Sequence, residues 1–324
     1  MEEKKIYVIH ENDEWVVPLR EGFAHWGLPH EEWFIDERAI DLAAAPPPGV
    51  FYNRMSASSH TRGHRYAPET TRILLDWLVR HGRKVVNGPR ALDLEINKVG
   101  QYLALARAGI DTPRTVAVSG VDALRGAARD FGEWPLIVKP NRGGKGLGVQ
   151  RVDSAQALDR LLDAGLAENA IDGIVLLQQY VRATEPYITR AEFIGGRFYY
   201  AVRVSTDQGF ELCPADVCEV GDAFCPAPGA EAQVPLPVAA PAPAAPRFDI
   251  LAERLPAAQI DAYERFLAAN DIGVAGIEFI ADEAGRVYTY DVNTNTNYNG
   301  AAESRTEYRA MRRLARHLGD LLEG

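Results

Sequence analysis

The segment that most constrains the fold is WPLIVKPNRGGKGLGVQRV, residues 134–152. Leu136 to Lys139 is typical of a buried strand, a glycine-rich run follows, and Val149 to Val152 predicts a second strand before any helix begins. In a dinucleotide-binding fingerprint the glycines open directly into a helix, and a Walker loop needs Ser or Thr where Gly146 stands after Lys145. Both of these nucleotide loops are therefore disfavoured. The order predicts a glycine-rich hairpin tip whose backbone amides can fold over phosphates, with a merely flexible hairpin as the alternative.

A second informative segment is GIEFIADEAGRVYTYDVNTNTNYN, residues 276–299, which predicts a β-hairpin with its turn at Gly285. Counting outward from the turn places Glu278 opposite Asp291, and strand alternation turns Asn293 to the same face as Asp291. Two facing carboxylates repel each other and weaken a hairpin unless something offsets the repulsion. The pattern therefore indicates an oxygen-rich site for a divalent cation such as Mg²⁺. A solvated polar hairpin is the alternative.

Composition limits the class of protein. The chain has 324 residues, 47% hydrophobic and 25% charged, which is typical of a water-soluble globular protein with two or three lobes. No apolar run is as long as a membrane span, and the charged N-terminus does not resemble a signal peptide, so we expect a cytoplasmic protein. A net charge of −10 argues against broad nucleic-acid binding. Cys213, Cys218 and Cys225 are odd in number and irregularly spaced, which indicates reduced thiols and disfavours a zinc site.

The remaining segments predict α/β lobes. Residues 4–95 alternate between strand and helix patterns, and Arg54 follows a strand at the edge where open α/β sheets hold ligands. Arg54 is therefore a candidate contact for an anionic small molecule, with a solvated loop as the alternative. One helix is predicted from Leu92 to Ala108 and a final one from Ser304 to Leu322. Residues 209–256 are rich in proline and alanine, which predicts an irregular linker or lid.

In their order and spacing these pieces resemble the ATP-grasp carboxylate–amine ligases, and most of all the RimK-type, or alpha-L-glutamate ligase, branch. The resemblance covers the chain from about Val50 onward. It implies an α/β fold of the ATP-grasp type. The implied parts are an N-terminal α/β pre-ATP-grasp domain (1–95), a small lobe with the glycine-rich loop (96–182) and a C-terminal lobe with the metal site (183–324). It also implies ATP as cofactor, with Mg²⁺ or Mn²⁺.

The resemblance gives each motif a role. Nucleotide contacts are implied for two lysines, the glycine-rich loop, the interlobe segment and one acid: Lys98, Lys139, Arg142, Gly143, Gly144, Gly146, Gly148, Gln178, Gln179, Tyr180, Val181 and Glu185. Within the interlobe segment, the backbone of Gln179 and Val181 would meet the adenine edge. The implied metal ligands are Glu278, Asp291 and Asn293, with the two acids exchanged relative to the usual order. Catalytic roles fall to Arg203, Arg190 and Lys145, and substrate contacts to Arg54, Asn295 and Asn297.

The implied activity joins a carboxylate and an amine, on an amino acid or short peptide, through an acyl phosphate. A kinase or acyl-phosphate-forming phosphotransferase of the same architecture is one alternative, and a non-catalytic ATP-binding module is another. The substrates stay unassigned because the Pro/Ala-rich stretch and residues 295–299 depart from the family pattern. Neither a nucleic acid nor a membrane is expected as a partner. The oligomeric state stays open, a homo-oligomer included.

Overall fold

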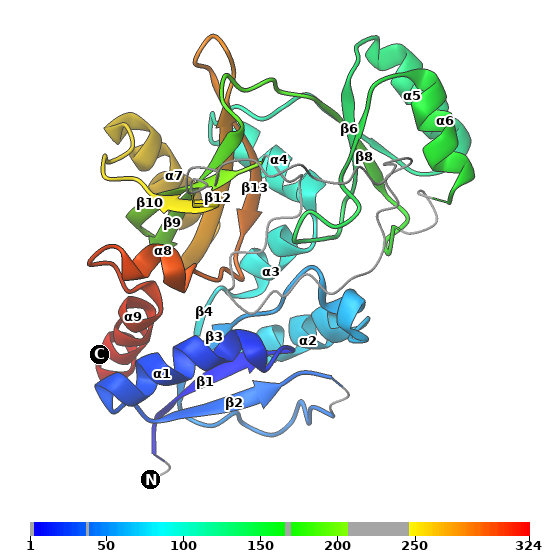
Figure 1. The fold of residues 1–324 in the computed structure, drawn as a ribbon. Helices are drawn as coiled ribbons and strands as arrows, with labels where there is room; N and C mark the ends of the chain where they lie inside the picture. The colour runs from blue at the N-terminus through cyan, green and yellow to red at the C-terminus, as the bar shows by residue number, and fades with distance from the viewer. Residues whose placement is uncertain (1–2, 37–38, 166–169, 207–245) are drawn as a thin grey trace, which may run out of the picture.

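The computed structural model describes residues 3–36, 39–165, 170–206 and 246–324, and it holds three β-sheets that surround a common centre (Figure 1). Each sheet draws on its own stretch of the chain. The three cysteines lie outside the described residues. Within the described residues, no helix is long and apolar enough to cross a bilayer.

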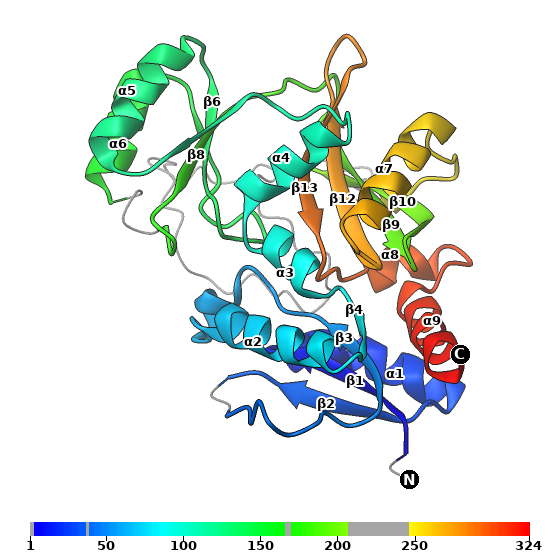
Figure 2. The same cartoon turned by 180° about the vertical axis from the view of Figure 1, so that it is seen from behind.

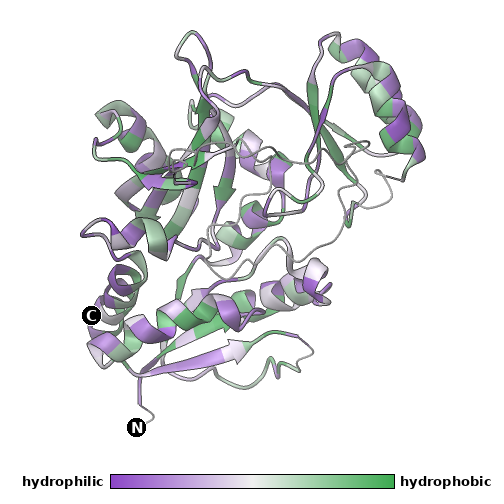
Figure 3. Ribbon diagram, viewed as in Figure 1, coloured by the Kyte–Doolittle hydropathy of each residue, from purple (hydrophilic) through white to green (hydrophobic). Residues whose placement is uncertain are grey.

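The N-terminal sheet is parallel and has the strand order β2-β1-β3-β4. Parallel strands need crossover connections, and the helices that supply them carry both hydrophilic and hydrophobic residues (Figure 3). Leu19 and Phe23 of the first of these helices belong to the same buried cluster as Ile6 and Val8 of the sheet. The elements are β1 (Lys5–His10), η1 (Glu14–Val16), α1 (Val17–Trp26), β2 (His30–Phe34), β3 (Gly49–Asn53), η2 (Ser59–Arg62), α2 (Ala67–Arg80) and β4 (Lys84–Val86).

The second sheet is antiparallel, has the order β5-β8-β6-β7 and carries the glycine-rich loop between β6 and β7. The strand–loop–strand order predicted for residues 134–152 is therefore confirmed. Helices α5 and α6 pack on the sheet through a cluster of buried aliphatic side chains. The elements are β5 (Thr115–Val118), α5 (Val121–Phe131), β6 (Leu136–Pro140), β7 (Gln150–Val152), α6 (Ala155–Asp163) and β8 (Val175–Gln179).

The third sheet is antiparallel, with the order β11-β10-β9-β12-β13, and it lies beside the second sheet in both views (Figure 1 and Figure 2). The predicted hairpin is confirmed, since Glu278 pairs with Asp291 across β12 and β13. Three residues of the Pro/Ala-rich stretch form the edge strand β11, so the prediction of irregular structure is wrong there. The elements are β9 (Tyr187–Ile194), β10 (Arg197–Ser205), β11 (Phe248–Ile250), α7 (Ala257–Ala269), β12 (Val274–Ala281) and β13 (Val287–Asn293).

The single helix predicted from Leu92 to Ala108 is wrong, because the chain forms two helices there, α3 (Pro89–Glu95) and α4 (Lys98–Arg107). Asn97 separates them. Its extended backbone and its side chain, which accepts a hydrogen bond from the Gly100 amide, make it the N-cap of α4. Lys98 is thus the first residue of a helix and not an interior one, which directs it toward the third sheet.

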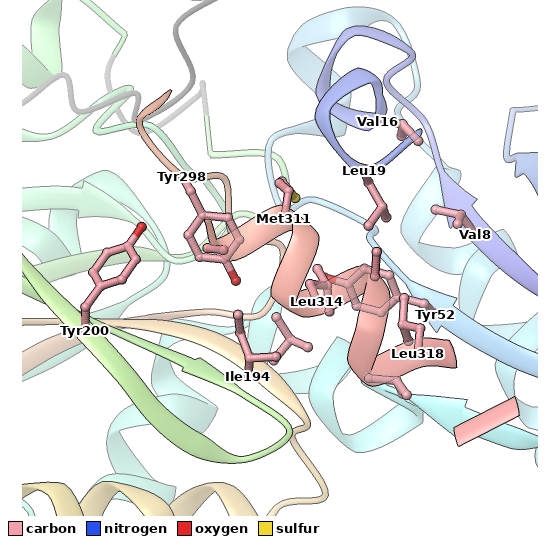
Figure 4. Packing of buried hydrophobic residues seen from close by; sticks show 14 of the residues in the cluster. Val8, Val16, Leu19, Tyr52, Ile194, Tyr200, Tyr298, Met311, Leu314 and Leu318 are labelled. Atoms are coloured by element: carbon pink, nitrogen blue, oxygen red, sulfur yellow. The ribbon is translucent and has the colours of Figure 1, made fainter. Parts of the chain in front are cut away.

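The final helix, predicted from Ser304 to Leu322, begins later than predicted: α8 (Gly300–Ser304) ends at Ser304, and the final helix is α9 (Ala310–Glu323). The apolar face of α9 lies between the N-terminal sheet and the third sheet, where Met311, Leu314 and Leu318 contact both sides (Figure 4). The indole of Trp26, in α1, donates to the Arg312 carbonyl at 2.9 Å. The C-terminal helix therefore completes the core of the N-terminal part. The domain boundaries stay a prediction.

A buried asparagine forms a second connection between these parts. Asn87 follows β4 in a left-handed conformation, with a φ of 59°. Its Oδ1 accepts from the amides of Gly273 and Val274, and its Nδ2 donates to the carbonyls of Val274 and Thr294, at 2.8 to 3.0 Å. All four hydrogen-bonding positions of the amide are thus used to fix the start of β12 and the end of β13 against the N-terminal sheet.

Candidate active site

The three sheets enclose a cavity of about 500 Å³. Most of the residues singled out from the sequence line it: Lys98, Lys139, Gly143, Gly144, Lys145, Gly146, Gln178, Gln179, Tyr180, Val181, Glu185, Arg190, Glu278, Asp291, Asn293, Asn295 and Asn297. Four do not line it: Arg54, Arg142, Gly148 and Arg203. The fold thus gathers motifs that are nearly two hundred residues apart in the sequence.

The paired carboxylates of β12 and β13 form the acidic part of the cavity. Lys98 Nζ lies 2.6 Å from Asp291 Oδ1, and Arg190 Nη1 lies 3.4 Å from Glu278 Oε1. Burial raises the pKa of Glu278, and the Asp291 charge adds to this, while Arg190 and Lys98 oppose it. The carboxylates of Glu278 and Asp291 and the amide of Asn293 fit a hard divalent cation, whose ligands are oxygens. These three residues could hold Mg²⁺.

The two predicted nucleotide lysines stand in different surroundings. For Lys98, burial acts to lower the pKa, but the charge and hydrogen bond of Asp291, together with Tyr102 and Glu95, outweigh it and the pKa is raised. Lys139 is buried over the rings of Tyr102 and Tyr290, at 5.4 and 5.7 Å from their centroids. Burial, with the charge of Lys98, lowers the pKa of Lys139 to about 7. The charges of Asp291 and Glu278 oppose this lowering in part, but within the described residues Lys139 forms no ion pair, which suits its ammonium to a phosphate group.

The glycine-rich loop lies across the cavity from the third sheet and contacts the N-terminal part. Lys145 has a φ of 61°, and its ammonium lies 4.6 Å from the centroid of the Trp15 ring. Burial lowers its pKa, helped by the positive charge of Arg62. Arg142 pairs with Glu69 of α2 at 2.8 Å, while Gly148 lines a smaller neighbouring cavity of about 170 Å³. The loop is thus held over the cavity by side chains at its own tip.

The base of the loop is tied to the start of α4. Asn141 Oδ1 accepts from the Val99 amide at 2.9 Å, and the Asn141 carbonyl accepts from the Lys98 amide at 3.3 Å. Asn141 Nδ2 donates to Asp172 at 2.7 Å. These bonds fix the loop relative to the lysine that pairs with Asp291.

The interlobe segment lines the cavity at the end of β8. The Gln179 amide donates to the Arg114 carbonyl at 2.8 Å, and its side-chain Oε1 accepts from the Arg114 amide at 3.2 Å. The N–H of Gln179 is therefore engaged within the protein, and a contact of the Gln179 backbone with an adenine edge stays a prediction. Val181 lies one position beyond Tyr180 and lines the cavity as predicted.

Arg190 is enclosed by a network of buried groups. Its Nε lies 2.7 Å from Glu192 Oε1, and its Nη2 donates to Thr296 Oγ1, which itself donates to Glu192 Oε2 at 3.0 Å. Gly276 makes room beside the guanidinium, since a Cβ there would overlap it. These contacts fix the Arg190 guanidinium, which faces Glu278.

Arg54 and Arg203 take positions that the sequence does not predict. Arg54 is only 2% exposed and donates to Asn297 Oδ1 at 2.7 Å and to the Thr296 carbonyl at 3.4 Å. The solvated loop given as the alternative is thus wrong for Arg54, whose guanidinium is buried and does not line the cavity, and a substrate contact by Arg54 stays a prediction. Arg203 is exposed, with its guanidinium 4.5 Å from the centroid of the Tyr187 ring. Tyr187 lines the cavity, and a catalytic role for Arg203 stays a prediction.

Several residues that line the cavity are not predicted from the sequence. The N-terminal part contributes Trp15, Ser56 and Ser58, and Glu95 and Tyr290 also line the cavity. Tyr290 precedes Asp291 in the hairpin already singled out, while tertiary packing brings the other four to the site. A strand end followed by Ser-x-Ser is the one local signal for two of them, because ligand groups gather at such ends in open α/β sheets.

Comparisons with known proteins find similarity to RimK-like ATP-grasp proteins. Residues 96–210 match the model of the RimK-like ATP-grasp domain. The tetrahydromethanopterin:alpha-L-glutamate ligase of Methanosarcina acetivorans is 33% identical over 129 residues, 37% of this chain and 39% of that protein. The aligned part of the chain thus spans about two fifths of that relative's length.

Solved structures resemble the whole chain. The RimK domain protein ATP-grasp from Sphaerobacter thermophilus matches with a TM-score of 0.64 and 17% identity, over 99% of this chain and 100% of that one. The ATP-grasp ligase PsnB, complexed with a phosphomimetic variant of its minimal precursor, Mg and ADP, matches with a TM-score of 0.63 and 17% identity, over 99% of each chain. These likenesses concern the fold. The predicted α/β ATP-grasp architecture is confirmed.

Proposed function

Since this chain carries a RimK-like ATP-grasp domain, we propose that it is an ATP-dependent carboxylate–amine ligase acting on an amino acid or short peptide. One observation carries the proposal. A single cavity is lined by a facing pair of carboxylates, two buried lysines and a glycine-rich loop. The relatives named as alpha-L-glutamate ligases, and the ligase PsnB complexed with its precursor peptide, support an amino acid or peptide substrate.

The proposed reaction has two steps. The substrate carboxylate oxygen attacks the γ-phosphorus of ATP, so that an acyl phosphate forms and ADP leaves. The amine nitrogen then attacks the acyl carbon, the C–O bond to phosphate breaks, and loss of one amine proton leaves an amide and inorganic phosphate. Such transfers depend on placement and charge stabilisation more than on covalent chemistry by the protein.

The chain's own residues supply that placement. Lys98 and Lys139 would bind the nucleotide phosphates, and the glycine-rich loop would exclude water, which otherwise hydrolyses an acyl phosphate. Arg190, fixed by Glu192 and Thr296, would bind the reacting carboxylate or phosphoryl group. Glu278, Asp291 and Asn293 would hold Mg²⁺, or Mn²⁺ in its place, and a bound cation offsets the negative charge of the phosphates.

Product analysis tests the proposal. The protein is incubated with ATP, Mg²⁺ and pools of amino acids and short peptides, and condensed masses are sought together with amine-dependent ADP release. The double variant Glu278→Gln, Asp291→Asn should abolish both signals, while Glu283→Gln, an exposed acid in the turn of the same hairpin, should keep them. ATP turnover that needs no amine and yields no amide mass would instead indicate a kinase or phosphotransferase.

A further inference from the structure

Two buried side chains of opposite charge lie beside the cavity. Glu95, the last residue of α3, is 7% exposed, and Arg54, directly after β3, is 2% exposed. Neither of them forms an ion pair within the part of the chain that the structure describes. A buried charge without a counter-ion is costly unless hydrogen bonds offset it. The hydrogen-bond partners of these two residues therefore indicate their role.

The Glu95 carboxylate accepts hydrogen bonds from two loops. Its Oε2 accepts from the Thr294 amide at 2.7 Å, from the Thr294 hydroxyl at 3.1 Å and from the Asn295 amide at 3.4 Å. Its Oε1 accepts from the Ala57 amide at 3.2 Å. Both oxygens thus act as acceptors, which a carboxylate can do and the amide group of glutamine cannot. One side chain therefore joins the loop after β3 to the segment after β13.

Arg54 binds the other end of the same segment. Its Nη2 donates to Asn297 Oδ1 at 2.7 Å and to the Thr296 carbonyl at 3.4 Å, and its Nη1 lies 3.9 Å from the sulfur of Met311. The anion thus binds N–H groups at the start of residues 294–297, and the cation binds oxygens at the end. Such charge-assisted hydrogen bonds are stronger than neutral ones. We call this arrangement, Glu95 and Arg54 around residues 294–297, the clamp.

The clamp sets one end of the cavity. Residues 294–297 carry two side chains that line it, Asn295 and Asn297. Ala57 stands between two serines that also line it. Because Glu95 binds the amides of both Ala57 and Asn295, the serines and the asparagines lie at the same end of the cavity. None of these contacts involves the interlobe segment at the end of β8, where the nucleotide base is expected.

We propose that Glu95 and Arg54 are positioning residues, which hold residues 294–297 in the conformation in which Asn295 and Asn297 bind the amino acid or peptide substrate. The choice of that substrate class rests on the proposed function. Neither positioning residue reacts, because both oxygens of Glu95 are engaged within the protein and Arg54 does not line the cavity. Loss of either charge frees the segment and weakens use of the substrate, while the nucleotide keeps its own contacts.

Kinetics with the pool of amino acids and short peptides tests the substrate part of the proposal. Glu95→Gln turns an NH₂ group toward a donating main-chain amide, and Arg54→Met removes the cation and keeps much of the side-chain volume. Each variant should raise the pool concentration for half-maximal ADP release by about tenfold or more, because charge-assisted bonds to the segment are lost. The half-saturating ATP concentration should change by less than about twofold.

The opposite charges of the two residues separate positioning from a direct effect of charge. Glu95 lies near Lys98 and helps to raise its pKa, so Glu95→Gln alone would also change the field at the phosphates. A direct effect of charge on the nucleotide would have opposite signs in Glu95→Gln and Arg54→Met, whereas a freed segment shifts both variants the same way. The double variant should be little worse than either single variant, because both charges act on one segment.

Hydrogen exchange reports on the segment without turnover. The amides of residues 294 and 295 should exchange about tenfold or more faster in both single variants than in the wild type. Thr294→Val removes only the hydroxyl bond to Glu95 and should give a smaller change of the same sign, which keeps the test open if Glu95→Gln does not fold. Glu133→Gln and Arg129→Met, which change exposed residues outside the cavity, should behave as the wild type.

Three results would overturn the proposal. The first is unchanged exchange at residues 294–297 in both Glu95→Gln and Arg54→Met. The second is a rise in the half-saturating ATP concentration as large as that for the pool, and the third is a pair of effects of opposite sign. Failure of the proposed function is distinct from these: a wild-type protein without amine-dependent ADP release would contradict the ligase activity and the assigned substrate, while hydrogen exchange would still decide whether the clamp holds the segment.

Discussion

Gly276 lies against the guanidinium of Arg190, so closely that a Cβ at position 276 would stand 2.8 Å from Arg190 Cζ. The two residues belong to neighbouring strands, β12 and β9. A glycine in a strand interior often marks a close approach, and here the approaching group is the arginine that faces Glu278.

Gly276→Ala is therefore expected to displace Arg190. Overpacking of this kind costs about 1–3 kcal/mol of unfolding free energy, and amide formation should fall far more than stability does. Thermal unfolding and product mass measure the two effects. Gly126→Ala is the matched control, because no atom lies within 4 Å of its added Cβ and alanine favours the helix α5 by up to about 1 kcal/mol. If Gly276→Ala formed amide at the wild-type rate, the position of the Arg190 guanidinium would not matter for catalysis.

Asp291→Asn should remove the ion pair with Lys98 and one carboxylate ligand of the proposed metal site. The ion pair of 2.6 Å is largely buried, and removing one partner of such a pair typically costs about 3–5 kcal/mol. We expect a lower midpoint in urea and a loss of Mg²⁺-dependent nucleotide binding, measured by calorimetry with and without the cation. Equal Mg²⁺ dependence in variant and wild type would show that Asp291 is not a metal ligand.

The pKa of Lys139, about 7, predicts two pH effects of opposite sign. Phosphate binding needs the ammonium, so nucleotide affinity should fall as the pH rises through 7. The unfolded chain keeps this proton up to the ordinary pKa of 10.5, so the contribution of Lys139 to the unfolding free energy should rise between pH 7 and 10.5. Lys139→Arg stays charged and should remove the first effect in a titration of nucleotide affinity against pH. An equally steep decline in that variant would assign the dependence to another group.

Asn87→Ala should destabilise the whole molecule. It removes four hydrogen bonds and leaves the amides of Gly273 and Val274 and the carbonyls of Val274 and Thr294 without these partners. Each buried group left unsatisfied costs about 1–3 kcal/mol, and alanine is also strained at a φ of 59°. A loss of more than about 3 kcal/mol in a denaturant titration is expected. Asn53→Ala is the milder comparison, because it removes two side-chain bonds, one donated to the Asn87 carbonyl and one accepted from the Met55 amide.

The sequence predicts the elements whose geometry is local. Strand alternation and one glycine turn are enough to place Glu278 opposite Asp291, because the register of a hairpin follows from its turn. The order of strand, glycine run and strand likewise follows from neighbouring residues. The same local reasoning joins α3 and α4 into one helix, because the apolar pattern continues across Asn97 and the capping bond depends on a side-chain orientation.

Other features of the site depend on contacts between distant segments. Trp15, Ser56 and Ser58 reach the cavity only because the N-terminal sheet is fixed against the third sheet by Asn87 and α9. The burial of Arg54 depends on residues about 240 positions further along the chain. Composition and periodicity carry no information on such distances, so neither predicted position of Arg54, a ligand contact or a solvated loop, anticipates its burial against Asn297.

The position of α9 has a consequence for biosynthesis. The indole of Trp26 and its acceptor, the Arg312 carbonyl, are 286 residues apart, and the apolar face between α1 and the N-terminal sheet is covered by that late helix. Nascent domains commonly fold in the order in which they leave the ribosome. Here part of the apolar surface of the N-terminal sheet stays exposed until the residues of α9 have been translated, so the core of this sheet cannot be completed earlier. Chaperone binding during synthesis should therefore concentrate on the earliest part of the chain.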